Sequence, residues 1–77
     1  MDAHKLITMA NQIAAFWGGD PDRAVAMAGM QSHLKRFWEP RLRRALYAHV
    51  DAHGPAGLHP LMAEMLQQQR ATLLPPA

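Results

Sequence analysis

Side chains suited to binding another macromolecule are concentrated in one short run, Phe37-Trp38-Glu39-Pro40-Arg41-Leu42-Arg43-Arg44. Tryptophan and arginine are the residue types that most often anchor protein interfaces. Guanidinium groups form charge-assisted hydrogen bonds, which are stronger than bonds between neutral groups. The chemistry that this run predicts is therefore non-covalent recognition rather than catalysis.

Groups that could carry catalysis or hold a metal are scarce in the rest of the sequence. His49 and His53 are four residues apart, a spacing that puts two imidazoles on one face of a helix, but zinc needs two further ligands. Cysteine is absent, which excludes disulfides, thiolate ligands and cysteine nucleophiles. No glycine-rich phosphate loop follows a strand. We therefore predict no catalytic, cofactor-binding or metal-binding residue in this chain.

The elements that must position these side chains are helices, because the hydrophobic period is helical throughout and no alternation predicts a strand. Asp2 is the expected N-cap of a first helix, and Asp20 followed by Pro21 is the expected start of a second. Pro40 and Pro60 start two more. The expected ranges are about 3–17, from Asp20-Pro21 toward Trp38, about 40–53, and from Pro60 to about Arg70.

Each expected helix carries an apolar stripe. In the first, the stripe runs through Leu6, Met9 or Ala10, Ile13, and Phe16 or Trp17; in the third, it comprises Leu42, Ala45, Leu46, His49 and Val50. Gly29 costs roughly 1 kcal/mol against alanine inside a helix, which favours a close helix crossing there. We predict an all-α fold, a compact bundle of three to four short helices forming one domain over residues 1–72, with an extended or frayed tail over 73–77.

The chain has 77 residues and a formal net charge of only +2, but its cations are unevenly distributed. Lys35, Arg36, Arg41, Arg43 and Arg44 lie within ten residues of one another. Such a run is either a solvated face or a docking patch for an acidic protein surface. No apolar run approaches the roughly 20 residues that span a bilayer, and the N-terminus lacks the pattern of a secretory signal. We therefore expect a cytoplasmic protein with no membrane association.

Residues 5–16, 33–43 and 57–61 resemble, in order and spacing, three segments of the delta subunit of the soluble, NAD-dependent, molybdenum-containing formate dehydrogenases. Residues 5–16, with Leu6, Met9-Ala10-Asn11-Gln12-Ile13 and Phe16, resemble the family's opening of Leu-x-x-Met-Ala-Asn-Gln-Ile and an aromatic. Residues 33–43 are similar to its Trp-Asp-Pro-Arg-Met-Arg segment, with Glu39 and Leu42 in place of Asp and Met. Gly57-Leu58-His59-Pro60-Leu61 is similar to its Gly-Leu-x-Pro-Leu signature. Together these segments cover about residues 5 to 65.

The resemblance implies a small, non-catalytic subunit of an enzyme that oxidises formate to carbon dioxide and reduces NAD. The complex would carry molybdenum bis-pterin, iron-sulfur clusters, FMN and NAD on its other subunits, with none bound by this chain. The delta subunit would dock on the catalytic alpha subunit and support assembly, cofactor insertion or stability of the complex.

Combining both lines of argument, we expect one partner-binding face made of Asn11, Gln12, Trp38, Arg41, Arg43 and Arg44. Two other interpretations use the same residues. In a helical nucleic-acid-binding module, the arginines would contact phosphates from the start of a recognition helix. In a self-associating helical protein, the methionines would be buried between copies.

Overall fold

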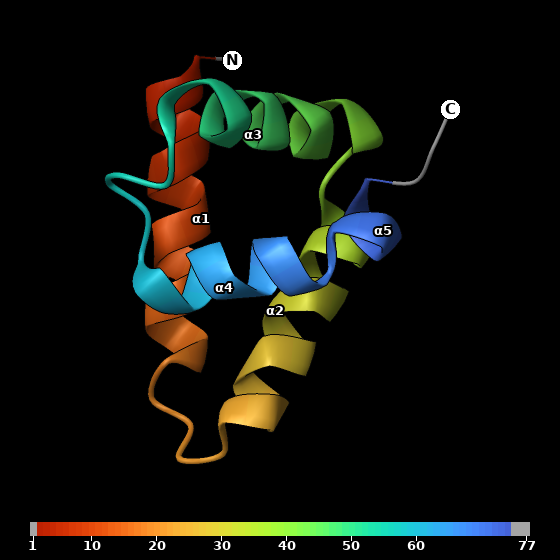
Figure 1. The fold of residues 1–77 in the computed structure, drawn as a ribbon. Helices are drawn as coiled ribbons and strands as arrows, with labels where there is room; N and C mark the ends of the chain where they lie inside the picture. Colours follow the sequence, from red (N-terminus) through yellow and green to blue (C-terminus); the bar gives the residue numbers. More distant parts are fainter. Residues whose placement is uncertain (1, 75–77) are drawn as a thin grey trace.

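The computed structural model describes residues 2–74, which form five α-helices and no strand in that range (Figure 1). The helices are α1 (Ala3–Trp17), α2 (Arg23–Phe37), α3 (Pro40–His53), α4 (Pro60–Gln68) and α5 (Arg70–Leu73). The predicted all-α class is confirmed, and the bounds of the first and third helices agree with their expected ranges. The fourth helix ends two residues early, and the single turn of α5 follows it.

The helices begin where a side chain accepts hydrogen bonds from amides of the first turn, or where a proline leaves one amide fewer to be bonded. Asp2 caps α1, with its Oδ1 accepting from the Lys5 amide at 2.9 Å. The expected cap at Asp20 is wrong, because Asp22 accepts from the amides of Ala24 and Val25 at 2.9 and 3.3 Å and so starts α2. Asp20 instead accepts from the Asp22 amide at 2.8 Å, which shapes the turn before the helix.

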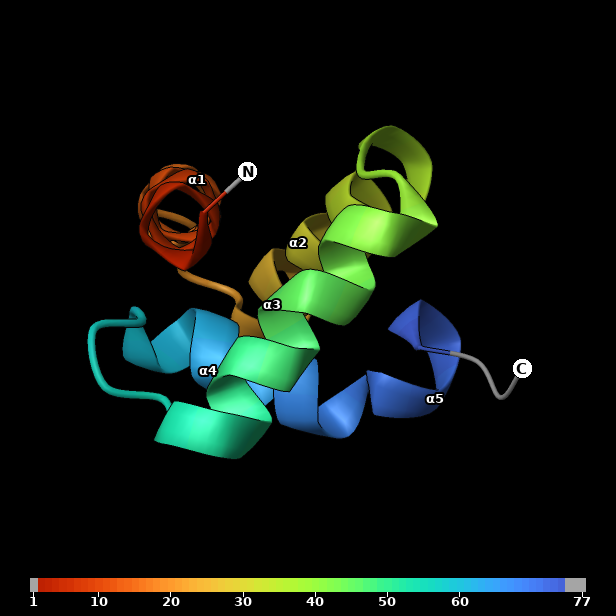
Figure 2. The ribbon, with the colours of Figure 1, turned by 90° about the horizontal axis from the view of Figure 1, so that it is seen from above.

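α1 and α2 form a hairpin whose connecting loop lies at the bottom of Figure 1, and α3 and α4 cross this pair at different heights (Figures 1 and 2). Small residues at the centre of the hairpin, Ala10, Ala14 and Ala26, are fully buried and allow close packing. The rest of the core comes mainly from leucine and methionine, and the buried methionines are Met30, Met62 and Met65. The core therefore lies where α1, α2, α3 and α4 meet.

The C-terminal boundary of the packed domain lies later than we expected. Leu73 is the last residue of α5 and is buried in the core, and Leu74 packs against that core. Lys35 Nζ also donates to the Thr72 main-chain oxygen at 3.1 Å. Leu73 therefore differs from the expected tail over 73–77, Leu74 follows the helix with non-helical backbone, and residues 75–77 lie outside the described part of the chain.

Tyr47, on α3, contacts residues of both α4 and α5. Its hydroxyl is buried and donates to the Leu66 main-chain oxygen at 2.6 Å. The Arg70 guanidinium lies 5.0 Å from the centre of the Tyr47 ring and pairs with Asp51 at 2.6 Å. Burial raises the pKa of Tyr47 to about 12, opposed in part by the positive charge of Arg70.

The pKa of Tyr47 predicts a loss of stability in alkali. An unfolded tyrosine has a pKa of about 10, so between about pH 10 and 12 the unfolded chain gives up a proton that the folded chain retains. The free energy of unfolding should fall across that window by roughly 1 kcal/mol per pH unit. Urea unfolding followed by circular dichroism at a series of pH values measures this slope.

Tyr47→Phe is the matched variant, and Tyr47 is the one tyrosine of the chain, so tyrosinate absorbance reports on it alone. The variant should unfold with a shallower pH dependence above about pH 10. A folded wild-type chain whose tyrosinate appears at the same pH as in urea would contradict the assignment.

Candidate docking surface

The run that suggested a partner-binding face forms a sharp corner between α2 and α3. Trp38 is the C-cap of α2, with its amide donating to the Leu34 oxygen at 3.2 Å. Pro40 is the first residue of α3, and Glu39 between them is extended. Proline has no amide hydrogen and disfavours helical geometry in the residue before it, so the chain must turn here. The predicted corner is confirmed.

Arg43, however, points into the protein rather than out of it, and only 7% of it is exposed. Its Nη1 donates to the main-chain oxygens of Leu34, Lys35 and Trp38 at 3.2, 3.1 and 3.2 Å. Its Nε donates to the oxygen of Leu73 at 3.1 Å. In this structure the guanidinium of Arg43 is occupied by bonds within the chain, and a contact of Arg43 with a partner remains a prediction from the sequence.

The position of Arg43 has a direct physical reason. The last turn of a helix leaves carbonyl groups without amide partners and carries a partial negative charge. The guanidinium of Arg43 satisfies one such carbonyl, that of Lys35, and adds a second donor to the Leu34 oxygen, which already accepts from the Trp38 amide; it also bonds to the oxygens of Trp38 and Leu73. Arg43 therefore acts as a C-terminal cap supplied by a neighbouring helix.

Trp38 and Asn11 also serve the fold. Trp38 is 6% exposed and belongs to the core cluster, so the chain itself covers most of this side chain, which we placed in the partner-binding face. The Asn11 side chain donates from Nδ2 to the Gly57 oxygen at 2.8 Å and accepts at Oδ1 from the His59 amide at 2.8 Å. Gly57 has φ 88°, a conformation that glycine adopts readily. Asn11 thus holds the loop before α4 against α1.

The remaining three of the six expected residues, Gln12, Arg41 and Arg44, are exposed. Arg41 pairs with Glu39 at 3.2 Å, and Arg44 forms no ion pair with any residue from 2 to 74. Lys35 and Arg36 are exposed at the neighbouring end of α2. We call the set Lys35, Arg36, Arg41 and Arg44 the basic corner, since it carries four positive charges beside the single carboxylate of Glu39.

Next to this corner, a hollow of about 530 Å³ opens between α1 and α2, bordered by Gln12 and by one edge of Trp38. Its other walls include Phe16, Trp17 and His33. Sequence reasoning missed this surface, because the helical period in α1 left Phe16 and Trp17 as alternatives for one buried position. The structure exposes Phe16 and buries Trp17 in part.

The histidines do not form a metal site with other residues that the structure describes. The rings of His49 and His53 lie 4.8 Å apart on α3, as their spacing predicted. Over residues 2–74, no group of three or more His, Asp or Glu side chains is arranged to hold a metal ion. His59 has a structural role, since its Nδ1 accepts from the Leu61 amide at 3.1 Å at the start of α4.

The described chain is thus a small helical domain with an aromatic-lined hollow between α1 and α2 and exposed cations at the corner between α2 and α3. No helix over residues 2–74 is long and apolar enough to cross a membrane. A family model for the NADH-dependent formate dehydrogenase delta subunit, FdsD, matches residues 5–66. The chain belongs to the FdsD family. No curated protein and no solved structure matches it significantly.

The role of Arg43 predicts that two adjacent arginines differ sharply in their effect on stability. Arg43→Met would leave four main-chain oxygens without their shared donor, and we expect it to lower the free energy of unfolding by about 2–4 kcal/mol. Arg44→Met removes the same charge from an exposed position and should change stability by less than about 0.5 kcal/mol. Chemical denaturation followed by circular dichroism would measure both, and equal losses would contradict the capping role.

Proposed function

We propose that this chain is a non-catalytic subunit of a cytoplasmic, molybdenum-containing formate dehydrogenase, and that it docks on the catalytic alpha subunit and stabilises the assembled complex. The observation that carries this proposal is the match of the FdsD family over residues 5–66, which covers most of the chain. A delta subunit implies protein partners within that complex. The oxidation of formate and the cofactors would then belong to the other subunits.

The structure divides the six residues of our sequence-based hypothesis into two groups. Gln12, Arg41 and Arg44 are exposed and are proposed to contact the alpha subunit. Asn11, Trp38 and Arg43 are proposed as positioning residues, because their contacts are made within the chain. In this proposal, Trp38 and Arg43 hold the corner from which Arg41 and Arg44 project, and Asn11 holds the loop before α4 against α1.

The basic corner favours a partner with a carboxylate-rich surface. Arg44 has no counter-ion among residues 2–74, and Arg41 shares only the carboxylate of Glu39. Arginine can bind a carboxylate through two parallel hydrogen bonds, which fixes orientation as well as contributing energy. The fold holds Arg41 and Arg44 on the first turns of α3, whose direction is set by the proline corner. A rigid helix end of this kind presents the two cations at a fixed separation.

Co-expression of the tagged chain with the other formate dehydrogenase subunits tests the proposal. The wild-type chain should co-purify with the alpha subunit, and deletion of its gene should lower the yield of active complex. Arg41→Ala combined with Arg44→Ala should weaken binding about tenfold, since each lost contact contributes roughly 0.5–1 kcal/mol. The helical content of the double variant should remain that of the wild type.

The matched control is Lys5→Ala combined with Arg23→Ala, which removes two positive charges from the starts of α1 and α2. The control should bind the alpha subunit like the wild type, because attraction to an acidic patch depends on where the charges lie. Equal weakening in both double variants would show a general charge effect. An unchanged yield of active enzyme without the chain would contradict the proposed role in stability.

A further inference from the structure

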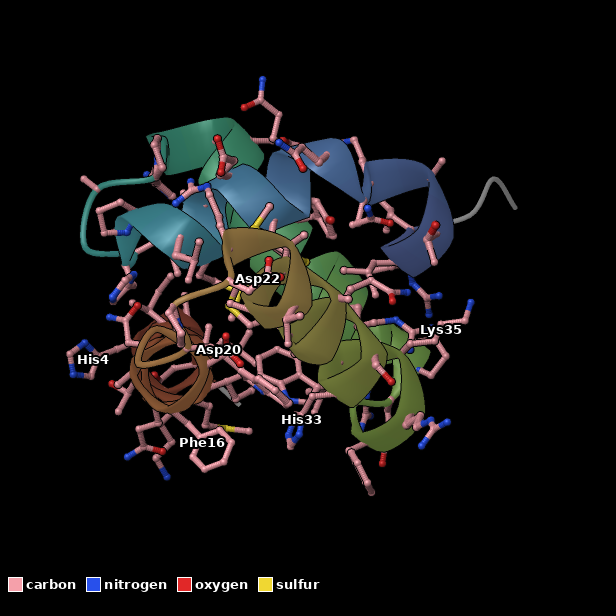
Figure 3. The ribbon with its side chains drawn as sticks, turned by 90° about the horizontal axis from the view of Figure 1, so that it is seen from below. His4, Phe16, Asp20, Asp22, His33 and Lys35 are labelled. Carbon is pink, nitrogen blue, oxygen red and sulfur yellow. The ribbon has the colours of Figure 1, made fainter. Side chains whose placement is uncertain are left out.

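The hollow beside the basic corner continues along the outer face of the α1–α2 hairpin. A second hollow of about 280 Å³ shares Trp17 and His33 with the first and extends to Phe37 and Arg36. Figure 3 shows Phe16 and His33 projecting to the same side of the molecule, away from α4. We call this continuous surface the aromatic groove and define it by Phe16, Trp17, His33, Arg36 and Phe37.

The floor of the aromatic groove is the indole of Trp17, and Gly29 makes room for it. A Cβ atom at Gly29 would lie 2.6 Å from the ring of Trp17, far inside contact distance. The absence of a side chain therefore lets the indole of Trp17 lie directly on α2. Phe16 then packs edge-on against that indole, with ring centres 5.3 Å apart at 88°. Gly29 does allow the close approach that we expected, although an indole rather than a helix backbone occupies the space.

Two phenylalanines on the groove remain largely uncovered by the chain's own residues. Phe16 is 76% exposed and Phe37 is 72% exposed, and Phe37 has the His33 ring beside it at 5.0 Å. Full burial of such a side chain contributes about 1.5–3 kcal/mol, so leaving two of them in water forgoes a substantial gain. Exposed apolar surface bordered by polar groups is typical of protein interaction sites.

The charges around the aromatic groove indicate which chemical groups would bind there favourably. Arg36 lines the groove and forms no ion pair with any residue from 2 to 74. The other three cations of the basic corner continue from the same end of α2. Asp20 and Asp22, beyond the opposite end of the hairpin, already accept main-chain amides. A favourable occupant therefore places carboxylates near Arg36.

We propose that the aromatic groove binds an amphipathic segment of the alpha subunit that carries two or more large apolar side chains followed by carboxylates. The apolar side chains cover Phe16, Trp17 and Phe37, and the carboxylates lie against Arg36 and the basic corner. This proposal rests on the proposed function and specifies how the two subunits meet. The contact would be a small hydrophobic centre with a charged edge, the usual layout of protein interfaces.

A second copy of the chain fits this surface less well. A two-fold contact through the groove would bring the same patch of both copies together. The linings of the two hollows include no Asp or Glu, so the groove of a second copy would offer no carboxylate to Arg36. The groove thus favours a partner of opposite charge over self-association. A nucleic acid would satisfy the cations but leave the walls of the hollow without apolar contacts.

Binding of purified alpha subunit to the full chain tests the groove directly. Phe16→Ala combined with Phe37→Ala should weaken binding by more than about tenfold, because both side chains lie at the centre of the contact. Both are exposed, so the variant should keep the wild-type helical content. Val25→Ala is the matched control, since Val25 is an exposed apolar residue at 46%, on α2 but outside the groove. It should bind like the wild type.

Photo-crosslinking in the assembled complex identifies the occupant. A photoreactive phenylalanine analogue at position 16 or 37 should crosslink to one alpha-subunit segment that contains large apolar residues and Asp or Glu. Crosslinks to a second copy of the chain, to nucleic acid or to a segment without carboxylates would overturn the proposal. If the wild-type chain does not bind the alpha subunit, both proposals fail; if the Phe16→Ala/Phe37→Ala variant binds as tightly as the wild type, only the groove proposal fails.

Discussion

A buried guanidinium supported entirely by main-chain carbonyls is the interaction on which this small fold depends. Arg43 bonds to the end of α2, to the residue at the corner and to the end of α5, so one side chain joins three parts of the chain. No carboxylate takes part in these bonds. The charge is stabilised by dipoles at a helix C-terminus, where a cation is favoured. The proline corner turns the chain, and the bonds of Arg43 then hold α3, with Arg41 and Arg44 on it, against the end of α2.

A second long-range contact links two of the segments that resemble the family. Asn11, in the first segment, bonds to Gly57 and His59, in the last. These residues are 46 and 48 positions apart in the sequence. The middle segment supplies Trp38 and Arg43, which join the core. The residues by which the family is recognised therefore mainly hold the helices and the loop before α4 together. The exposed side chains around the aromatic groove project from these helices.

The sequence was sufficient to predict that α1, α2, α3 and α4 exist, but not to predict α5 or which side of each helix is buried. Capping residues and prolines act locally, so the bounds of α1 and α3 could be predicted. The stripe expected for α3 excluded Arg43, whereas the buried residues are Arg43, Leu46 and Tyr47. Hydrophobic periodicity cannot identify a buried cation, because its partners are carbonyls of another helix and leave no trace in the local pattern. Periodicity also could not decide that Phe16 faces solvent while Trp17 packs on Gly29, because Gly29 lies on a different helix.

The unequal surroundings of the two tryptophans give the protein a natural optical probe. The indole of Trp38 is largely enclosed by the core and only borders the hollow, so its fluorescence should respond less to an occupant than that of Trp17. The indole of Trp17 lies on the floor of the aromatic groove and is only partly covered. Any molecule that seats there must displace water from that ring and shift its emission toward shorter wavelengths. Ligand titrations therefore require no added dye.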